Sequence, residues 1–289
     1  MNRTPCSDDV FGHEPVARTQ QIRRVHVAGM KLRTLVWPSS TPGTPLLIFN
    51  GIGARAEMLA PFADALPDIE VITFDVPGTG ESSPAPVPYR LWMLSIIASQ
   101  LLTRLGYTQV DTLGVSWGGA IAQQFALQNP RRCRRLILAA TSPGFVMVPP
   151  KWSVLTKFAT PRRYNDPQFR RAIAGQIYGG RARSNPELID EFQRTSWLGY
   201  LLQQVAITGW SSLPWLRLLR QPTLILAGND DPVITLPNAR LMAHMIPDAQ
   251  LRVLDDGHLF IIFSAAETAA QVQEFLSHKP ARKAANDQA

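Results

Sequence analysis

The chain has 289 residues, of which 45% are apolar and 18% are charged, and its formal net charge is +7. This composition excludes a disordered or coiled-coil protein and predicts a globular one with a substantial core. No apolar run reaches the roughly 18 residues that a membrane span needs, and the polar residues 1–16 lack the apolar segment of a secretory signal. We therefore expect a cytoplasmic protein without a transmembrane segment.

Charge and cysteine content narrow the range of ligands. The densest basic cluster, residues 131–135, is interpreted as a solvated helix end where cations face the negative pole of the helix, with attraction to an acidic surface as the alternative. The sequence shows no basic stripe with interleaved aromatic residues, so no nucleic-acid partner is expected. Cys6 and Cys133 lack the neighbours of a zinc or redox motif, and the sequence therefore predicts no metal site.

Most of the chain alternates between short apolar runs and helical patterns, between a loose N-terminal tail (1–20) and a flexible C-terminal tail (279–289). The predicted strands are 22–27, 31–37, 46–49, 69–74, 110–113, 136–141, 222–228 and 250–254. The predicted helices are 54–66, 91–105, 117–127, 238–245 and 265–276. The first two strands form a hairpin, and the later alternation predicts an α/β protein with a mostly parallel, doubly wound sheet.

The segment 145–215 interrupts this alternation after the sixth predicted strand. It contains broken helical stretches, several prolines and many of the aromatic residues, but no clear buried strand. We interpret it as a helical cap, or lid, over the functional site; the alternative for its individual aromatic residues is packing within the cap and against the core. The core then comprises residues 21–144 and 216–278.

The stretch Gly114-Val115-Ser116-Trp117-Gly118 joins a predicted strand to a predicted helix. A Gly-x-Ser-x-Gly in this position is the nucleophile elbow of α/β-hydrolases. The tight turn presents the Ser116 hydroxyl at the edge of the sheet, and the flanking glycines avoid crowding there. The N–H of Trp117, at the start of the helix, faces the place where an oxyanion would form. Ser116 is therefore the candidate nucleophile, with an ordinary glycine-rich turn as the alternative.

A serine hydroxyl needs a base and an orienting acid, which follow it in this fold in the order Ser, acid, His. His258 follows the last predicted strand, and strand ends deliver catalytic groups in open α/β sheets. The acid is expected directly after the strand 222–228. Asp231 is favoured because hydrolases of this kind place the acid three residues after the glycine, and Asp230 is the alternative.

A second oxyanion donor is expected in the loop after the strand 46–49. Gly51-Ile52-Gly53 occupies this position, and the backbone N–H of Ile52 would pair with that of Trp117. Because glycines let a backbone approach the substrate closely, Gly51 and Gly53 are the candidate substrate-binding residues. A plain tight turn is the alternative.

Together these residues resemble the α/β-hydrolase superfamily and, more narrowly, the intracellular poly(3-hydroxyalkanoate) depolymerases of the medium-chain-length type. The resemblance extends from the hairpin to the last helix and includes parts of the cap. The matching stretches are PLLIFNGIGA (45–54), FDVPGTGESS (74–83), GVSWGGAIAQQFA (114–126), AATSPGFVMVP (139–149), PRRY (161–164), IYGG (177–180), PTLILAGNDDP (222–232) and DDGHLF (255–260).

The resemblance implies the α/β-hydrolase fold and a catalytic triad of Ser116, Asp231 and His258. It also implies hydrolysis of ester bonds in a polyester stored as cytoplasmic granules, with release of 3-hydroxyacids or oligomers and with no metal or organic cofactor. The implied partner is the polymer or the granule surface, and the oligomeric state stays open. The alternatives are a small-molecule carboxylesterase, lactonase or C–C bond hydrolase with the same triad, and a granule-coating or receptor-like protein that has lost catalysis.

Overall fold

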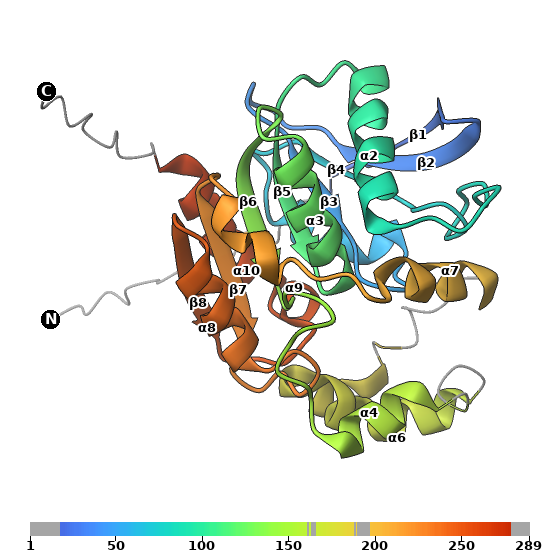
Figure 1. Ribbon diagram of the computed structural model, residues 1–289, viewed down its shortest axis with the longest axis vertical. Helices are drawn as coiled ribbons and strands as arrows, with labels where there is room; N and C mark the ends of the chain where they lie inside the picture. The colour runs from blue at the N-terminus through green and yellow to red at the C-terminus, as the bar shows by residue number, and fades with distance from the viewer. Residues whose placement is uncertain (1–17, 161, 163–165, 188, 190–196, 279–289) are drawn as a thin grey trace, which may run out of the picture.

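The computed structural model describes residues 18–160, 162, 166–187, 189 and 197–278 (Figure 1). Within these residues, eight strands form one sheet in the order β1-β2-β4-β3-β5-β6-β7-β8. The strands are β1 Gln21–Val27, β2 Met30–Trp37, β3 Leu46–Phe49, β4 Val71–Phe74, β5 Val110–Val115, β6 Cys133–Ala139, β7 Thr223–Gly228 and β8 Ala249–Leu254. The hairpin β1–β2 and the pair β2–β4 are antiparallel, and the other pairs are parallel. The predicted fold class is confirmed.

Helices lie on both faces of this sheet and beyond the ends of its strands (Figure 1). The helices of the core are η1 Ala56–Leu59, α1 Ala60–Asp64, α2 Leu91–Leu105, α3 Trp117–Gln128, α8 Leu236–Met245, α9 Phe260–Phe263 and α10 Ala265–Ser277. Between β6 and β7, the elements whose bounds are described are α4 Trp152–Ala159, α6 Pro167–Tyr178, η2 Gly180–Arg183, α7 Trp197–Ile207 and η4 Leu213–Leu218. None of the described helices is both long enough and apolar enough to cross a membrane.

Two large hydrophobic clusters fill the two faces of the sheet. Along β3, Leu47 and Phe49 belong to the cluster shared with α2, α3 and α8, whereas Leu46 and Ile48 belong to the cluster shared with α1, α9 and α10. Successive side chains of a strand point to opposite faces, so a fully apolar strand packs against helices on both sides. This arrangement is the doubly wound sheet that the apolar runs predicted.

Two helical predictions differ from the structure. The helix expected over 54–66 is divided into η1 and α1, because Pro61 has no N–H to donate and fits only in the first turn of a helix. The short helix α9 was not predicted, since four residues are too few to show helical periodicity. In contrast, α2 has the predicted bounds and ends at Gly106, whose φ of 87° suits the end of a helix.

The basic cluster 131–135 is not a solvated helix end throughout, and that interpretation is wrong for its last two arginines. Because β6 begins at Cys133, Arg134 and Arg135 are strand residues. Arg134 forms a bidentate pair with the buried carboxylate of Asp111 on β5, at 2.8 and 2.5 Å. The buried Arg135 donates to the carbonyls of Leu276 and His278, so it does meet the negative pole of a helix, but that helix is α10.

Most of the expected N-terminal tail (1–20) and all of the C-terminal tail (279–289) lie outside the described residues, as do Cys6 and most of the PRRY stretch. Arg18 belongs to the expected tail but is hydrogen-bonded to the core. Its guanidinium donates to the carbonyl of Ala63 at 2.6 Å and to that of Ile69 at 3.1 Å. The chain is therefore attached to the sheet and helices from residue 18 onward.

The described part of the segment 145–215 consists of helices and loops. It pairs with the core backbone through one isolated bridge between Gly144 and Ser211. Figure 1 shows α4 and α6 together below the sheet, with α7 above them and to the right. Hydrogen bonds from α6 and α7 reach the loops that carry the candidate catalytic residues, and those contacts are described next.

Candidate active site

Ser116 lies at the junction of β5 and α3 in a strained backbone conformation. Its φ and ψ are 53° and −117°, in the left-handed half of φ space that residues with a Cβ rarely occupy. The turn is held by hydrogen bonds from Ser116 N to the carbonyl of Ala139, at 2.9 Å, and from the Thr141 hydroxyl to the carbonyl of Ser116, at 2.7 Å. The residue is only partly buried.

The glycines of the motif are required by close packing around this turn. A Cβ on Gly114 would lie 2.5 Å from the Cα of Gly119, and one on Gly118 would overlap the backbone carbonyls of Phe49 and Asn50. In both cases the Cβ would lie too close to backbone atoms, which cannot move aside as the end of a flexible side chain can. The crowding expected from the sequence is therefore present, and it also involves Gly119, whose Cβ would overlap Thr141.

The structure brings Ser116, His258 and Asp231 together from the ends of three strands. His258 Nε2 is 3.0 Å from the Ser116 Oγ, and its Nδ1 is 2.7 Å from Asp231 Oδ2. The imidazole and the carboxylate are both buried. With the proton on Nδ1, the ring donates to Asp231 and presents its Nε2 lone pair to the serine hydroxyl, the arrangement that general-base activation requires.

The second oxygen of Asp231 is also satisfied. Oδ1 accepts hydrogen bonds from the backbone N–H groups of Val233 and Ile234, at 2.8 and 2.9 Å. These bonds fix the carboxylate in one orientation, so that Oδ2 points to the imidazole. Three hydrogen bonds therefore hold the buried Asp231 side chain in place.

Asp230, the alternative acid, faces away from His258. Its carboxylate pairs with Arg183 at 2.8 Å and accepts from the backbone N–H of Gly180 at 2.7 Å. Partial burial acts to raise the pKa of Asp230, but the hydrogen bonds from Gly180 and Arg183 outweigh it and hold the pKa below its usual value. Of the two neighbouring aspartates, Asp231 is therefore hydrogen-bonded to the imidazole of His258, and Asp230 is hydrogen-bonded to residues of η2.

Tyr178 was assigned no role from the sequence, although it contacts His258 directly. Its backbone carbonyl accepts from the His258 N–H at 2.7 Å, and its ring stacks beside the imidazole with a centroid distance of 6.4 Å. Nearby, Asp256 accepts from Ser264 and from the backbone of Arg181, which fixes the loop before His258. The only sequence signal was that Tyr178 lies in the matching stretch IYGG (177–180). That match does not indicate which residues Tyr178 contacts.

The loop after β3 lies beside the nucleophile, as expected for an oxyanion loop. A Cβ on Gly51 would lie 3.8 Å from the Cβ of Ser116. Neither Ile52 N–H nor Trp117 N–H has a hydrogen-bond partner among the described residues, so both remain available to a ligand. The N–H of Gly53 is not available, because it donates to Gln203 Oε1 of α7 at 2.7 Å.

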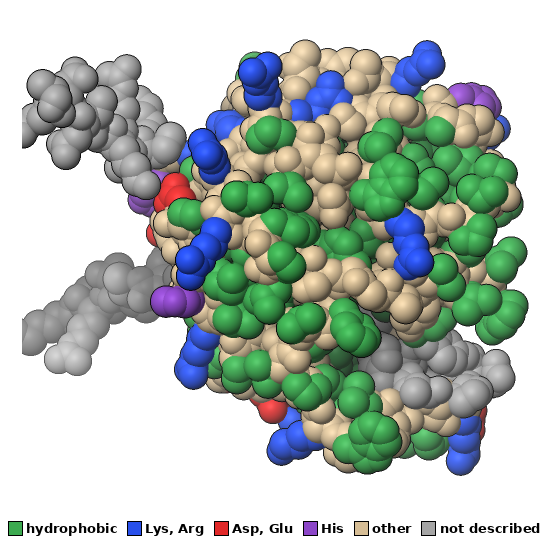
Figure 2. All heavy atoms as spheres, viewed as in Figure 1, with side chains coloured by type: hydrophobic (Ala, Val, Ile, Leu, Met, Phe, Trp, Pro, Cys, Tyr) green, Lys and Arg blue, Asp and Glu red, His purple; other side chains and the backbone are tan. Residues whose placement is uncertain are grey.

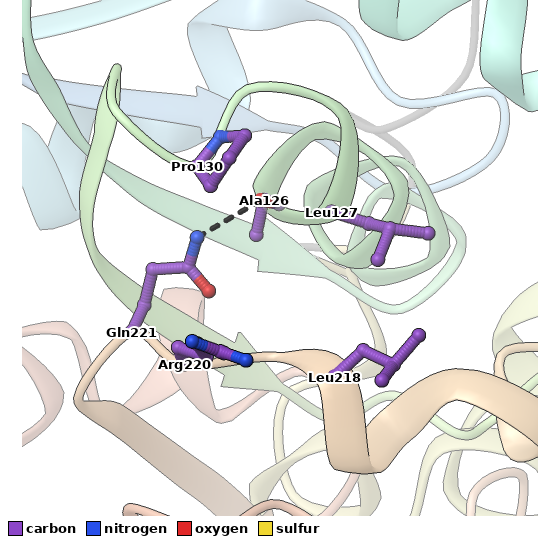
Figure 3. A pocket seen from close by; sticks show the side chains of 6 residues that line it. All are labelled: Ala126, Leu127, Pro130, Leu218, Arg220 and Gln221. Atoms are coloured by element: carbon purple, nitrogen blue, oxygen red, sulfur yellow. Dashed lines mark hydrogen bonds between the residues drawn. The ribbon is translucent and has the colours of Figure 1, made fainter.

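Other candidate sites in the described part of the chain are weaker. No three His, Cys, Asp or Glu side chains gather there as a metal ion would require. A pocket of about 300 Å³ lies between the end of α3 and η4, lined by apolar side chains together with Arg220 and Gln221 (Figure 3). Gln221 donates there to the carbonyl of Ala126 at 2.9 Å. Because Ser116 precedes the opposite end of α3, this pocket is separate from the serine.

Comparison with known proteins gives the family. Residues 44–265 match the model of the alpha/beta hydrolase fold, and the chain belongs to this family. It is 49% identical over 265 residues to the poly(3-hydroxyalkanoate) depolymerase of Ectopseudomonas oleovorans, a match that covers 90% of this chain and 94% of that protein. The expected resemblance to such depolymerases is thereby confirmed.

Other hydrolases are more distantly similar. The chain is 29% identical over 279 residues to the 2-hydroxymuconate semialdehyde hydrolase of a Pseudomonas species, covering 90% of this chain and 95% of that one. The crystal structure of the enol-lactonase from Burkholderia xenovorans superposes with a TM-score of 0.75 at 22% identity, covering 89% of this chain and 100% of that one. This last likeness concerns the fold alone.

Proposed function

We propose that the protein is a serine hydrolase that cleaves the ester bonds of intracellular poly(3-hydroxyalkanoate), with a preference for the medium-chain-length polymer. The observation that carries the proposal is the continuous hydrogen-bonded chain from Ser116 through His258 to Asp231. It occurs in a protein with 49% identity to a poly(3-hydroxyalkanoate) depolymerase over nearly its whole length.

In the proposed mechanism, His258 Nε2 takes the proton of the Ser116 hydroxyl as Oγ attacks the ester carbonyl. The negative charge on the tetrahedral intermediate is stabilised by the N–H groups of Ile52 and Trp117. The intermediate collapses to an acyl-enzyme, and His258 returns its proton to the departing alkoxide. His258 then takes a proton from water as the water attacks the acyl-enzyme. As the second tetrahedral intermediate collapses, His258 gives that proton to the departing Ser116 Oγ, which restores the free enzyme and releases a 3-hydroxyacid or oligomer. No step needs a metal or organic cofactor.

Segment 145–215 is proposed to act as a cap that meets the polymer at the surface of cytoplasmic granules. Several large apolar side chains of this segment are exposed, including Phe145, Trp152 and Trp197, at 74, 78 and 77%. Figure 2 shows hydrophobic side chains over much of the side of the molecule on which α2 and α7 lie. Such surface is unusual for a protein that meets only water, and it suits a water-insoluble aliphatic polyester.

A small-molecule hydrolase is the second candidate, in the form of a carboxylesterase, lactonase or C–C bond hydrolase. It is favoured by the 29% identity to a 2-hydroxymuconate semialdehyde hydrolase over 90% of the chain. The same triad would serve each of these reactions, so the catalytic residues do not discriminate between them.

The decisive experiment uses the purified protein and its Ser116→Ala variant on protein-free suspensions of medium-chain and short-chain polymer. Clearing of the medium-chain suspension by the wild type alone supports the proposal and its chain-length preference. Clearing of only the short-chain suspension would contradict the preference. If neither suspension clears while soluble esters are hydrolysed, the second candidate replaces the first. Labelling of Ser116 by a fluorophosphonate tests separately whether the serine is activated.

A further inference from the structure

Gln203 of α7 joins the two loops that carry the candidate oxyanion donors. Its side-chain Oε1 accepts the hydrogen bond from the Gly53 N–H at 2.7 Å, and its main-chain carbonyl accepts from the Trp117 indole Nε1–H at 3.1 Å. The residue is 1% exposed. It lies 150 positions from Gly53 and 86 from Trp117 in the sequence. The two loops are thus connected to each other through a residue of α7 that is distant from both.

The contact with Gly53 acts on the neighbouring donor, Ile52. The N–H of Gly53 belongs to the peptide unit between Ile52 and Gly53, so holding that unit restricts the backbone rotation of Ile52. Gly53 has a φ of 69°, and a Cβ on it would lie 3.4 Å from the ring of Tyr200, one turn before Gln203 on α7. The loop is thus held by an acceptor and by a ring, both from α7.

The contact with Trp117 acts on the other donor. Trp117 is the first residue of α3, and its own N–H is the second candidate oxyanion donor. Its buried indole is held by the carbonyl of Gln203. The helix α7 therefore contacts the side chain of one donor residue and the peptide unit that follows the other. Stabilisation of an oxyanion depends on donors that are already in place before the charge develops.

We propose that Gln203 is a positioning residue that holds the Ile52–Gly53 peptide so that the Ile52 N–H converges with the Trp117 N–H on the oxyanion. The inference rests on the proposed ester hydrolysis, but not on the identity of the polymer. It also gives α7 a function beyond covering the site, because the oxyanion loop is complete only when α7 is in place.

The first test is Gln203→Met, which keeps the length of the side chain and removes the acceptor. On a soluble p-nitrophenyl ester we expect kcat to fall by about 10- to 100-fold, somewhat less than the loss of an oxyanion donor itself, with KM changed by less than about threefold because ground-state binding is retained. The matched control is Gln176→Met, the same substitution on α6, where the side chain is exposed and bonds Lys157. It should retain the kcat of the wild type.

The second test, Gln203→Glu, keeps the acceptor and adds a titratable group. Burial raises the pKa of the introduced carboxyl. While protonated it accepts from Gly53 as glutamine does, and when it ionises its negative charge opposes the oxyanion. We therefore expect the kcat of this variant to decline with rising pH in a limb that the wild type lacks. Below the pH of that limb its kcat should exceed that of Gln203→Met, because the protonated carboxyl still accepts from the Gly53 N–H. A residue that only packs α7 would give the two variants the same kcat there.

The outcomes separate this inference from the proposed function. Unchanged kcat in a folded Gln203→Met variant, or a Gln203→Glu profile that parallels the wild type, overturns the role of Gln203 while leaving the hydrolase intact. A wild type that hydrolyses soluble esters but not polymer leaves both tests valid. A wild type that hydrolyses no ester overturns the proposed function and the inference together.

Discussion

Asp230 and Asp231 are neighbours in sequence but have opposite surroundings. Asp231 is 6% exposed and shares its oxygens between the imidazole of His258 and two backbone N–H groups. The Asp230 side chain is 47% exposed and pairs with Arg183. Only the buried carboxylate can hold the imidazole in the tautomer whose Nε2 is free to accept a proton.

Substitution of the two aspartates should therefore have very different effects. Asp231→Asn should lower kcat on a soluble ester by about 10³- to 10⁴-fold, because the amide no longer favours the proton on Nδ1. Asp230→Asn should change kcat little, since the surface ion pair with Arg183 is lost while the amide oxygen of asparagine can still accept from the Gly180 N–H. Steady-state kinetics with circular dichroism as the check on folding would measure both. The opposite ranking would assign the acid to Asp230.

Cys133 gives a prediction about reactivity. Burial raises the pKa of its thiol to about 12, and only the thiolate is an effective nucleophile. In a Cys6→Ser background we expect no alkylation of Cys133 by iodoacetamide at pH 8 in the native protein, and complete alkylation in guanidinium chloride. Mass spectrometry would follow the reaction. Native-state alkylation at the rate of a small exposed thiol would show that β6 is not packed as described.

At the scale of elements, the sequence predicted those helix and strand bounds that depend on a local pattern of residues. The helix expected over about 91–105 matches α2, which ends before Gly106, where a positive φ suits the end of a helix. The start of β6 was missed because Arg134 and Arg135 do not resemble strand residues. Their partners, Asp111 on β5 and the end of α10, are brought close only by the fold.

The same limit applies to the candidate site. Ser116, Asp231 and His258 were predicted because each lies in a motif with a known place at the end of a strand. Tyr178, Arg183 and Gln203 act across the boundary between the segment 145–215 and the core, through hydrogen bonds between residues distant in sequence. No local pattern encodes such contacts, so they could be found only in three dimensions.

The helix α7 has an inner face toward the site and an outer face toward solvent. Leu202, Gln203 and Ala206 are buried, whereas Trp197, Leu201 and Val205 are exposed. Residues 197–207 include no charged side chain. An uncharged apolar outer face suits an uncharged polyester better than an anionic surface, which would call for basic residues.

Trp197→Ser should accordingly weaken action on polymer without affecting the chemistry. We expect binding to polymer particles to weaken by about 10- to 150-fold, from the roughly 1.5–3 kcal/mol that burial of a large apolar side chain contributes. The kcat on a soluble ester should stay within about twofold of the wild type. The control is Val253→Ser on the edge strand β8, where Val253 is 48% exposed. Equal clearing of polymer by all three proteins would contradict a role for α7 in contact with the polymer.

At the scale of the whole molecule, the segment 145–215 is attached to the core at His258, the candidate general base. The Tyr178 carbonyl binds the His258 N–H, Gly180 N–H binds Asp230, and Arg181 N–H binds Asp256. Glycines allow this close approach, since a Cβ on Gly180 would overlap the backbone of Gly257, next to His258. The position of the loop that carries the base is therefore coupled to the position of α6 and η2.

This coupling predicts that Gly180→Ala will impair hydrolysis of every ester, soluble or polymeric. The added methyl group must displace the loop of His258, and a shift of about 1 Å in a catalytic group can cost on the order of 10²-fold in rate.

The matched control is Gly209→Ala. Gly209 also has a positive φ, 74° against 46° for Gly180, but no atom lies within 4 Å of the added Cβ. Both variants place a residue with a Cβ at a positive φ, which costs about 1 kcal/mol. Thermal unfolding should therefore show that both lose a similar amount of stability to this backbone strain. Comparison of kcat/KM then isolates the steric effect, and equal activity of the two variants would show that the segment and the histidine loop move independently.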